Sequence, residues 1–213
     1  MFVRDRMSTP AVTVKPDMPF QDALRLMQER RFRRLPVIEN NILVGIVAER
    51  DLMYASPSPA TSLSVWEMNY MLSKIVVSRL MTPEVITVTP DTTVEAAATL
   101  GQDRGIGTLP VVEDGRVVGV ITTTDLYRIL TDVLGFGAAG ARLRIHTQTV
   151  VAPQGQITEI IAKHGATIVS MFYTAPRPTA AKKDLIIHLD VTDTGRIVDD
   201  LKAKGYEVET LTR

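Results

Sequence analysis

The sequence predicts a mixed α/β chain with two β-α-β-β-α units in a pseudo-two-fold pair, followed by a smaller β-α-β-β-α-β domain. Two observations support this prediction. The first two thirds of the chain repeat themselves at one fixed spacing, and the last third alternates β-branched runs with helical patterns. A glycine-rich stretch over 135–141 separates these two parts.

The internal repeat appears when the sequence is shifted by 74 residues. Met7 then falls on Met81 and Asp51 on Asp125, and no gap is needed between them. The landmarks in between include Thr13 on Thr87, Val14 on Val88, and Leu35-Pro36-Val37 on Leu109-Pro110-Val111. So many coincidences at one offset predict two copies of one structural unit.

Each copy has the same predicted order of elements. A short β-branched run, 12–14 or 85–88, ends near a proline, and Asp17 or Asp91 then precedes an amphipathic helix as its expected N-cap. A helix opened by Asp51 or Asp125 closes the unit. Two strands that flank a turn lie in between, at 35–38 with 42–47 and at 109–112 with 117–122.

The predicted organisation has five parts, because one such unit is small for a core of its own and two would pack together. They are a first unit over 1–57, a linker and connecting helix over 58–76, a second unit over 77–134, a flexible hinge over 135–141 and a last domain over 142–213.

The paired units resemble CBS repeats, whose tandem pair is called a Bateman module. The residues that support the resemblance are Leu35-Pro36-Val37-Ile38, Gly45-Ile46-Val47 and Asp51-Leu52, then Leu109-Pro110-Val111-Val112, Gly119-Val120-Ile121 and Asp125-Leu126. The resemblance covers about residues 1–134. It implies a non-catalytic regulatory protein that binds AMP, ADP or ATP in the cleft of the pair and needs no cofactor.

The end of the second unit supplies a candidate site for a phosphate and a ribose. Residues 119–125 end a strand in hydroxyl groups and begin a helix, so backbone N–H groups and Thr122 suit a phosphate, while Asp125 suits two ribose hydroxyls. The resemblance implies this use of Thr122 and Asp125, and it adds four residues of the first copy, Thr13, Val14, Arg33 and Arg34. Alternatively, Asp125 only caps a helix and the arginines form a solvated basic helix end.

The first copy departs from this pattern, because Ala48 stands where the second copy has Thr122 and Glu49 adds a negative charge. We therefore expect a second cleft to be weak, empty or suited to a less charged ligand. Its expected residues are Asp51, Thr87, Val88 and Thr108.

The last third of the chain has the predicted order of a ferredoxin-like fold. Its predicted strands are 142–150, 167–173, 184–191 and 206–211, and its predicted helices are 154–164 and 197–204. Gly155, Gly165-Ala166-Thr167-Ile168-Val169 and Gly205-Tyr206-Glu207-Val208 resemble landmarks of an ACT domain, although the first loop and Thr167 depart from the amino-acid-binding pattern. A CBS pair followed by an ACT-like domain resembles the acetoin-utilisation protein B family.

The Gly-x-Gly-x-x-Gly match at 135–140 follows a predicted helix rather than a strand, which argues against a dinucleotide site.

The composition offers no pattern typical of catalysis. The chain has no cysteine, equal numbers of basic and acidic residues at 24 each, and three histidines in separate predicted elements without metal-ligand spacing, namely His146, His164 and His188. We expect no catalytic residue, no metal, no nucleic-acid or membrane partner, a cytoplasmic location, a homodimer and an unidentified regulated protein. The alternatives are an enzyme or accessory subunit of acetoin breakdown, and a constitutive dimer scaffold without a ligand.

Overall fold

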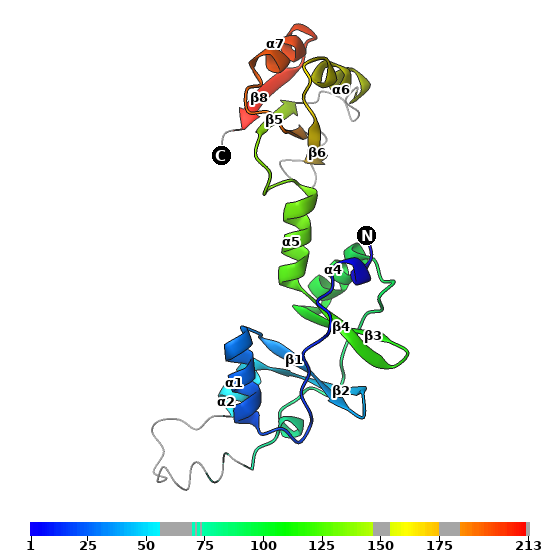
Figure 1. Ribbon diagram of the computed structural model, residues 1–213, viewed down its shortest axis with the longest axis vertical. Helices are drawn as coiled ribbons and strands as arrows, with labels where there is room; N and C mark the ends of the chain where they lie inside the picture. Colours follow the sequence, from blue (N-terminus) through cyan, green and yellow to red (C-terminus); the bar gives the residue numbers. More distant parts are fainter. Residues whose placement is uncertain (56–69, 71, 73, 147–153, 175–183, 212–213) are drawn as a thin grey trace. The chain divides into compact units, whose positions relative to one another are not determined.

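The computed structural model describes residues 1–55, 70, 72, 74–146, 154–174 and 184–211. The chain forms two compact units, Met1–Leu126 and Tyr127–Arg213 (Figure 1). Most of the predicted linker and connecting helix over 58–76 lies outside the described residues.

The first unit contains both repeats, and each repeat supplies two strands to one antiparallel sheet with the order β1-β2-β4-β3. The two hairpins meet where Ile42 pairs with Arg116. Both repeats therefore have the predicted hairpin and flanking helices. The elements are α1 (Phe20–Arg30), β1 (Arg34–Glu39), β2 (Ile42–Ala48), α2 (Glu49–Tyr54), α4 (Val94–Arg104), β3 (Thr108–Glu113), β4 (Arg116–Thr122) and α5 (Thr123–Val133), the last of which continues into the second unit.

The predicted first strand of each repeat is shorter than expected. Val14 forms a single parallel bridge with Val37, donating its N–H to Pro36 O and accepting from the N–H of Ile38. A longer ladder would need N–H groups from Pro36 and Pro16, and proline has none. The second repeat has the same arrangement at Val88, bounded by the corresponding prolines.

The helix starts also differ from the prediction. Thr93, and not Asp91, caps α4, since its Oγ1 accepts a hydrogen bond from Ala96 N at 3.2 Å. The carboxylate of Asp91 instead pairs with the guanidinium of Arg4. In the first repeat α1 begins after Pro19, so Asp17 lies too far before the helix to cap it.

The first residues of each repeat complete the core of the other repeat. The short 3₁₀ helix η1 (Val3–Asp5) places Val3, which is fully buried, among the core residues of the second repeat. Its counterpart η2 (Val77–Arg79) places Val77 in the core of the first repeat. Ser8 pairs with Val120, and Thr82 pairs with Ile46 in the same way. The two repeats therefore exchange segments and form one unit.

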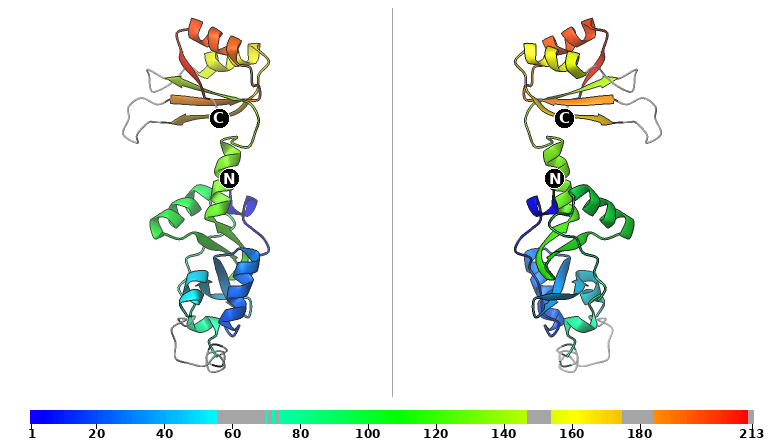
Figure 2. Two further views of the ribbon diagram at one scale, coloured as in Figure 1. Left: turned by 90° about the vertical axis from the view of Figure 1, so that its left-hand side faces the viewer. Right: turned by 90° about the vertical axis from the view of Figure 1, so that its right-hand side faces the viewer.

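The second unit has the predicted β-α-β-β-α-β order. Its antiparallel sheet has the order β6-β7-β5-β8, and α6 and α7 cover one face of that sheet (Figure 2). The elements are β5 (Ala141–His146), α6 (Gln154–Lys163), β6 (Ile168–Thr174), β7 (Asp184–Leu189), α7 (Gly195–Ala203) and β8 (Glu207–Leu211). The end of the predicted strand 142–150 falls outside the described residues.

The helix-covered face of this sheet forms the core of the second unit. Alternate residues of β5 and β7, among them Leu143, Ile145, Leu185 and Ile187, are fully buried against the apolar sides of α6 and α7. Leu134, directly before the glycine-rich stretch, also bonds to this sheet, since its carbonyl O accepts a hydrogen bond from Ser170 Oγ at 2.9 Å. Within the described ranges, no helix combines the length and apolar character needed to cross a bilayer.

Candidate ligand-binding cleft

A cleft of about 580 Å³ lies between the two repeats of the first unit. This volume falls in the range of about 300–1,000 Å³ that is typical of small-molecule sites. The first repeat contributes the end of α1 and the start of β1, and the second contributes the starts of β3 and α5. The lining residues are Ser8, Pro10, Val12, Arg31, Phe32, Arg33, Arg34, Leu35, Pro36, Gly107, Thr108, Val120, Thr122, Thr123, Thr124 and Asp125.

Thr122 and Asp125 form a tight pair at the start of α5. Asp125 Oδ2 accepts hydrogen bonds from the N–H of Thr122 at 2.9 Å and from its Oγ1 at 2.7 Å. Thr122 Oγ1 in turn accepts from the N–H of Asp125 at 3.3 Å. This is the reciprocal pattern of a capping box. Asp125 thus helps to cap the helix, as the alternative interpretation predicts. It also lines the cleft, so a capping role and a ligand-binding role do not exclude each other.

The arginines at the end of α1 bring positive charge to the opposite wall. Arg31, Arg33 and Arg34 line the cleft, where Asp125 is the acidic residue among the lining side chains. Arg34 reaches the second repeat, because a Cβ built on Gly107 would lie 3.4 Å from Arg34 Nη1 and 3.1 Å from Thr123 Oγ1. This excess of guanidinium groups suits an anion that carries phosphate.

The cleft also has an apolar side that the sequence analysis did not identify. Phe32 is 36% exposed at the end of α1, and Pro10 and Val12 belong to the segment that crosses from one repeat to the other. An aromatic ring and aliphatic side chains of this kind suit the flat, weakly polar face of a purine. The signal in the sequence was the aromatic residue beside the arginines, but its exposure depends on the left-handed turn at Arg31 that ends α1.

Two of the predicted residues are not among those that line the cleft. Val14 is 2% exposed and packs in the core of the first repeat, while its N–H and C=O groups both bond to β1. Thr13 precedes it and is not among the residues that line the cleft. The family resemblance alone placed Val14 at the cleft, and in the structure its backbone forms the parallel bridge to Val37.

Of the four residues predicted for a second cleft, one lines the cleft described above. Thr108 lines the same cleft as Thr122, because the register of the β3–β4 hairpin pairs these two residues directly. Val88 is 6% exposed and belongs to the core of the second repeat. Asp51 and Thr87 are not among the lining residues of the cleft, and Asp51 Oδ1 lies 3.9 Å from Arg50 Nε.

The described residues contain no group of three histidine, aspartate or glutamate side chains arranged to hold a metal ion. His164 and His146 each contact carboxylates in the second unit, Asp200 for His164 and both Asp184 and Glu209 for His146.

Comparison with known proteins matches the two repeats to one family. The sequence model of the family described as CBS domain matches residues 3–58 and 77–132, which together are more than half of the chain.

Three solved structures resemble the first unit. An acetoin utilization protein (AcuB) from Vibrio cholerae is 28% identical, with a TM-score of 0.54 over 64% of this chain and 95% of its own. CBSX2, a protein of Arabidopsis thaliana solved in complex with AMP, is 34% identical, with a TM-score of 0.52 over 62% of this chain and 97% of its own. The CBS domain pair of protein MJ0100, solved with 5'-methylthioadenosine and S-adenosyl-L-methionine, is 27% identical, with a TM-score of 0.51 over 61% and 95%.

Proposed function

This chain belongs to the CBS domain family, and we propose that it is a regulatory protein whose paired repeats bind an adenine nucleotide. The proposed ligand is AMP, ADP or ATP at micromolar to sub-millimolar affinity, in the cleft of about 580 Å³. The observation that supports this proposal best is the juxtaposition of Thr122 and Asp125 with Arg34 of the other repeat across one cleft.

The proposed roles follow from the chemistry of the two walls. Asp125 accepts hydrogen bonds from the ribose hydroxyls. Thr122 Oγ1 donates to a phosphate oxygen when its hydroxyl turns from Asp125 Oδ2 to the ligand, and the positive N-terminal end of α5 favours the phosphate there. Arg33 and Arg34 add charge-assisted bonds to the same phosphate from the first repeat. Thr108 joins this site. Thr13 and Val14 contribute by supporting β1, since the N–H of Val14 bonds to Pro36 O at 3.0 Å beside the cleft.

The ligands of the similar solved structures support an adenine compound. The charge of the cleft then distinguishes between the classes of adenine compound. CBSX2 is described in complex with AMP, and MJ0100 with 5'-methylthioadenosine and S-adenosyl-L-methionine. Three arginines in the cleft favour a phosphorylated nucleotide over S-adenosyl-L-methionine, whose sulfonium group is itself positive.

The test is isothermal titration of the purified full chain with AMP, ADP, ATP and S-adenosyl-L-methionine. Asp125→Asn is the informative variant because asparagine retains an acceptor for the helix cap. We expect this variant to lose about ten- to a hundredfold in affinity, as befits hydrogen bonds to a charged group of about 1.5–3 kcal/mol. The matched control is Asp51→Asn, the corresponding residue of the first repeat, which we expect to leave affinity unchanged.

The result also separates the alternatives. Unchanged affinity in Asp125→Asn would remove Asp125 from the site. An absence of heat with every compound, on protein shown to be free of bound nucleotide, would favour the scaffold without a ligand. Turnover of a nucleotide or of acetoin by the purified chain would favour the enzyme or accessory subunit.

We propose further that the chain is a cytoplasmic homodimer with an ACT-type second unit and that its regulated partner acts in acetoin or energy metabolism. The β-α-β-β-α-β order of that unit supports the ACT type, and the likeness to the Vibrio cholerae protein supports the metabolic role. Light scattering on the eluting protein tests the dimer. Acetoin consumption by cells that lack the protein tests the metabolic link.

A further inference from the structure

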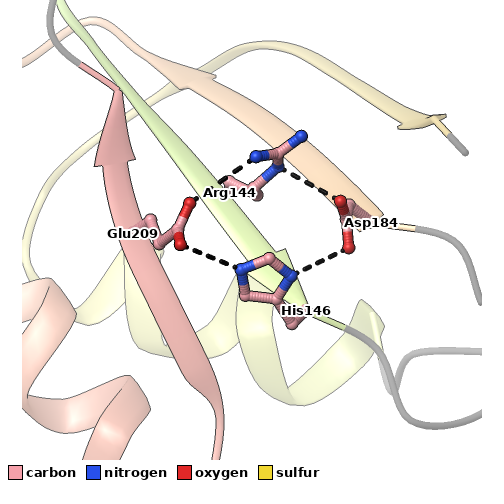
Figure 3. Close-up of polar contacts among 4 residues, drawn as sticks. All are labelled: Arg144, His146, Asp184 and Glu209. Carbon is pink, nitrogen blue, oxygen red and sulfur yellow. Dashed lines mark hydrogen bonds and ion pairs between the residues drawn. The ribbon is translucent and has the colours of Figure 1, made fainter. Parts of the chain in front are cut away.

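Four charged side chains form a closed ring on the face of the second sheet opposite α6 and α7 (Figure 3). Arg144 and His146 project from β5, Asp184 from β7 and Glu209 from β8. His146 Nδ1 lies 3.0 Å from Asp184 Oδ1, and His146 Nε2 lies 3.3 Å from Glu209 Oε1. Arg144 closes the ring, with Nε 3.1 Å from Asp184 Oδ2 and Nη1 3.6 Å from Glu209 Oε2.

The geometry requires a particular protonation state of the imidazole. Each ring nitrogen of His146 faces a carboxylate oxygen, and an ionised carboxylate only accepts hydrogen bonds. A neutral imidazole has one N–H, so it satisfies one carboxylate and presents a lone pair to the other. Only the imidazolium donates to both Asp184 and Glu209.

Charge balance leads to the same conclusion. Among the described residues, the charged groups that face His146 are Arg144 on its own strand, Asp184 on β7, and Glu209 and Glu207 on β8. Glu207 is the residue that pairs with His146 in the strand register. Against Arg144 alone, these carboxylates leave an excess of negative charge that a proton on His146 reduces. The hydrogen bond to Glu209 contributes most to raising the pKa of His146 above its ordinary value of 6.5, Asp184 adds to this, and burial opposes it.

The strand that this ring holds is an edge strand. Among the described strands, the sheet order places β8 beside β5 alone, so β8 has one hydrogen-bonded neighbour there. Glu209 is the side chain through which β8 joins the ring, and Asp184 on the central strand β7 is its buried anchor, with a side chain 11% exposed. Loss of one contact therefore weakens the attachment of β8 more than that of a strand with two neighbours.

We propose that Arg144, His146, Asp184 and Glu209 form a proton-dependent clamp that ties the edge strand β8 to β5 and β7. Because the folded state holds the proton more tightly than the unfolded state, the clamp contributes its full stability below the unfolded pKa of His146. That contribution is lost as the pH rises through the higher folded pKa. The clamp closes in mildly acidic conditions and loosens as the pH rises.

The experiment follows the full chain across about pH 5 to 8 by NMR of the imidazole groups and by amide hydrogen exchange corrected for intrinsic rates. We expect the His146 signals to titrate with a midpoint above 6.5. We also expect the protection of β8 amides to fall about two- to fivefold through this midpoint, as for a partly exposed ion pair. Strand β6, the other edge of the sheet, is the internal reference and should not change in step.

Two variants isolate the clamp, and a third is the matched control. His146→Gln and, independently, Glu209→Gln should abolish the pH dependence of β8 protection. His164→Gln, at a histidine 3.0 Å from the Asp200 carboxylate, should preserve it. A titration midpoint of His146 at or below 6.5 would overturn the proposal. So would protection of β8 amides that does not depend on pH, or the same pH-dependent loss of that protection in folded His146→Gln.

Discussion

The exchange of segments between the repeats predicts that a residue at the very start of the chain stabilises the second repeat. Val3 is fully buried among Val88, Leu109, Val111 and Ile121, although more than 80 residues separate it from them in sequence. Its N–H also donates to Thr92 O at 2.8 Å. The informative perturbation is Val3→Ala, which removes side-chain volume and keeps the backbone bond.

The magnitude follows from burial. Valine to alanine removes two methyl groups, and at about 0.8 kcal/mol per buried carbon the transfer loss is about 1.6 kcal/mol. The unfilled cavity raises the expected cost to about 2–3 kcal/mol. A loss of that size is a substantial part of the total stability of about 5–15 kcal/mol that is typical of a domain. Val12→Ala is the control from the same segment, because Val12 is 38% exposed and should cost less than about 0.5 kcal/mol.

The assay is urea unfolding of the full chain combined with amide exchange of each hairpin. We expect Val3→Ala to lower the free energy of unfolding and to weaken protection first in β3 and β4. Val77→Ala, the corresponding change, should do the same first in β1 and β2. A loss below about 0.5 kcal/mol for Val3→Ala, equal to that of the exposed valine, would show that the segment is not part of the second core.

Two further predictions concern the cleft and the second unit. Arg34→Gln should weaken AMP binding about tenfold or more in calorimetry. Adenosine binding should not change, because the lost hydrogen bonds go to the phosphate. Arg30→Gln is the control, since Arg30 is not among the lining residues of the cleft. Gly135→Ala should destabilise the second unit by about 1–3 kcal/mol in thermal unfolding, since Gly135 has φ of +66° and a Cβ there would lie 2.7 Å from His188 Nδ1. Gly137→Ala, where a Cβ meets nothing within 4 Å, should be close to neutral, and equal losses in both variants would contradict this account.

Local sequence patterns determined much of the fold. The 74-residue repeat predicted two copies of one unit, and the structure has matching helices and hairpins in both. The Asp114-Gly115 turn, with positive φ at both residues, sets the register that brings Thr108 beside Thr122. These features depend on residues that are neighbours along the chain, so hydrophobic period and turn chemistry suffice to predict them.

The sequence predicted part of the candidate cleft for a related reason. Thr122 and Asp125 are three residues apart at a strand-to-helix junction, where side chains and N–H groups converge whatever the rest of the fold does. Arg33 and Arg34 line the same cleft, but nothing local distinguishes them from a solvated helix end. Their resemblance to a family pattern, rather than their spacing, identified them.

Only the tertiary structure decided which segments complete each other. The insertion of Val3 and Val77 into opposite cores and the burial of Val14 depend on contacts between distant parts of the chain. The same holds for the clamp around His146, whose partners lie 38 and 63 positions further along the chain. Short-range periodicity carries no information about such pairs, because the free energy that selects them comes from burying whole faces against each other rather than from any local preference.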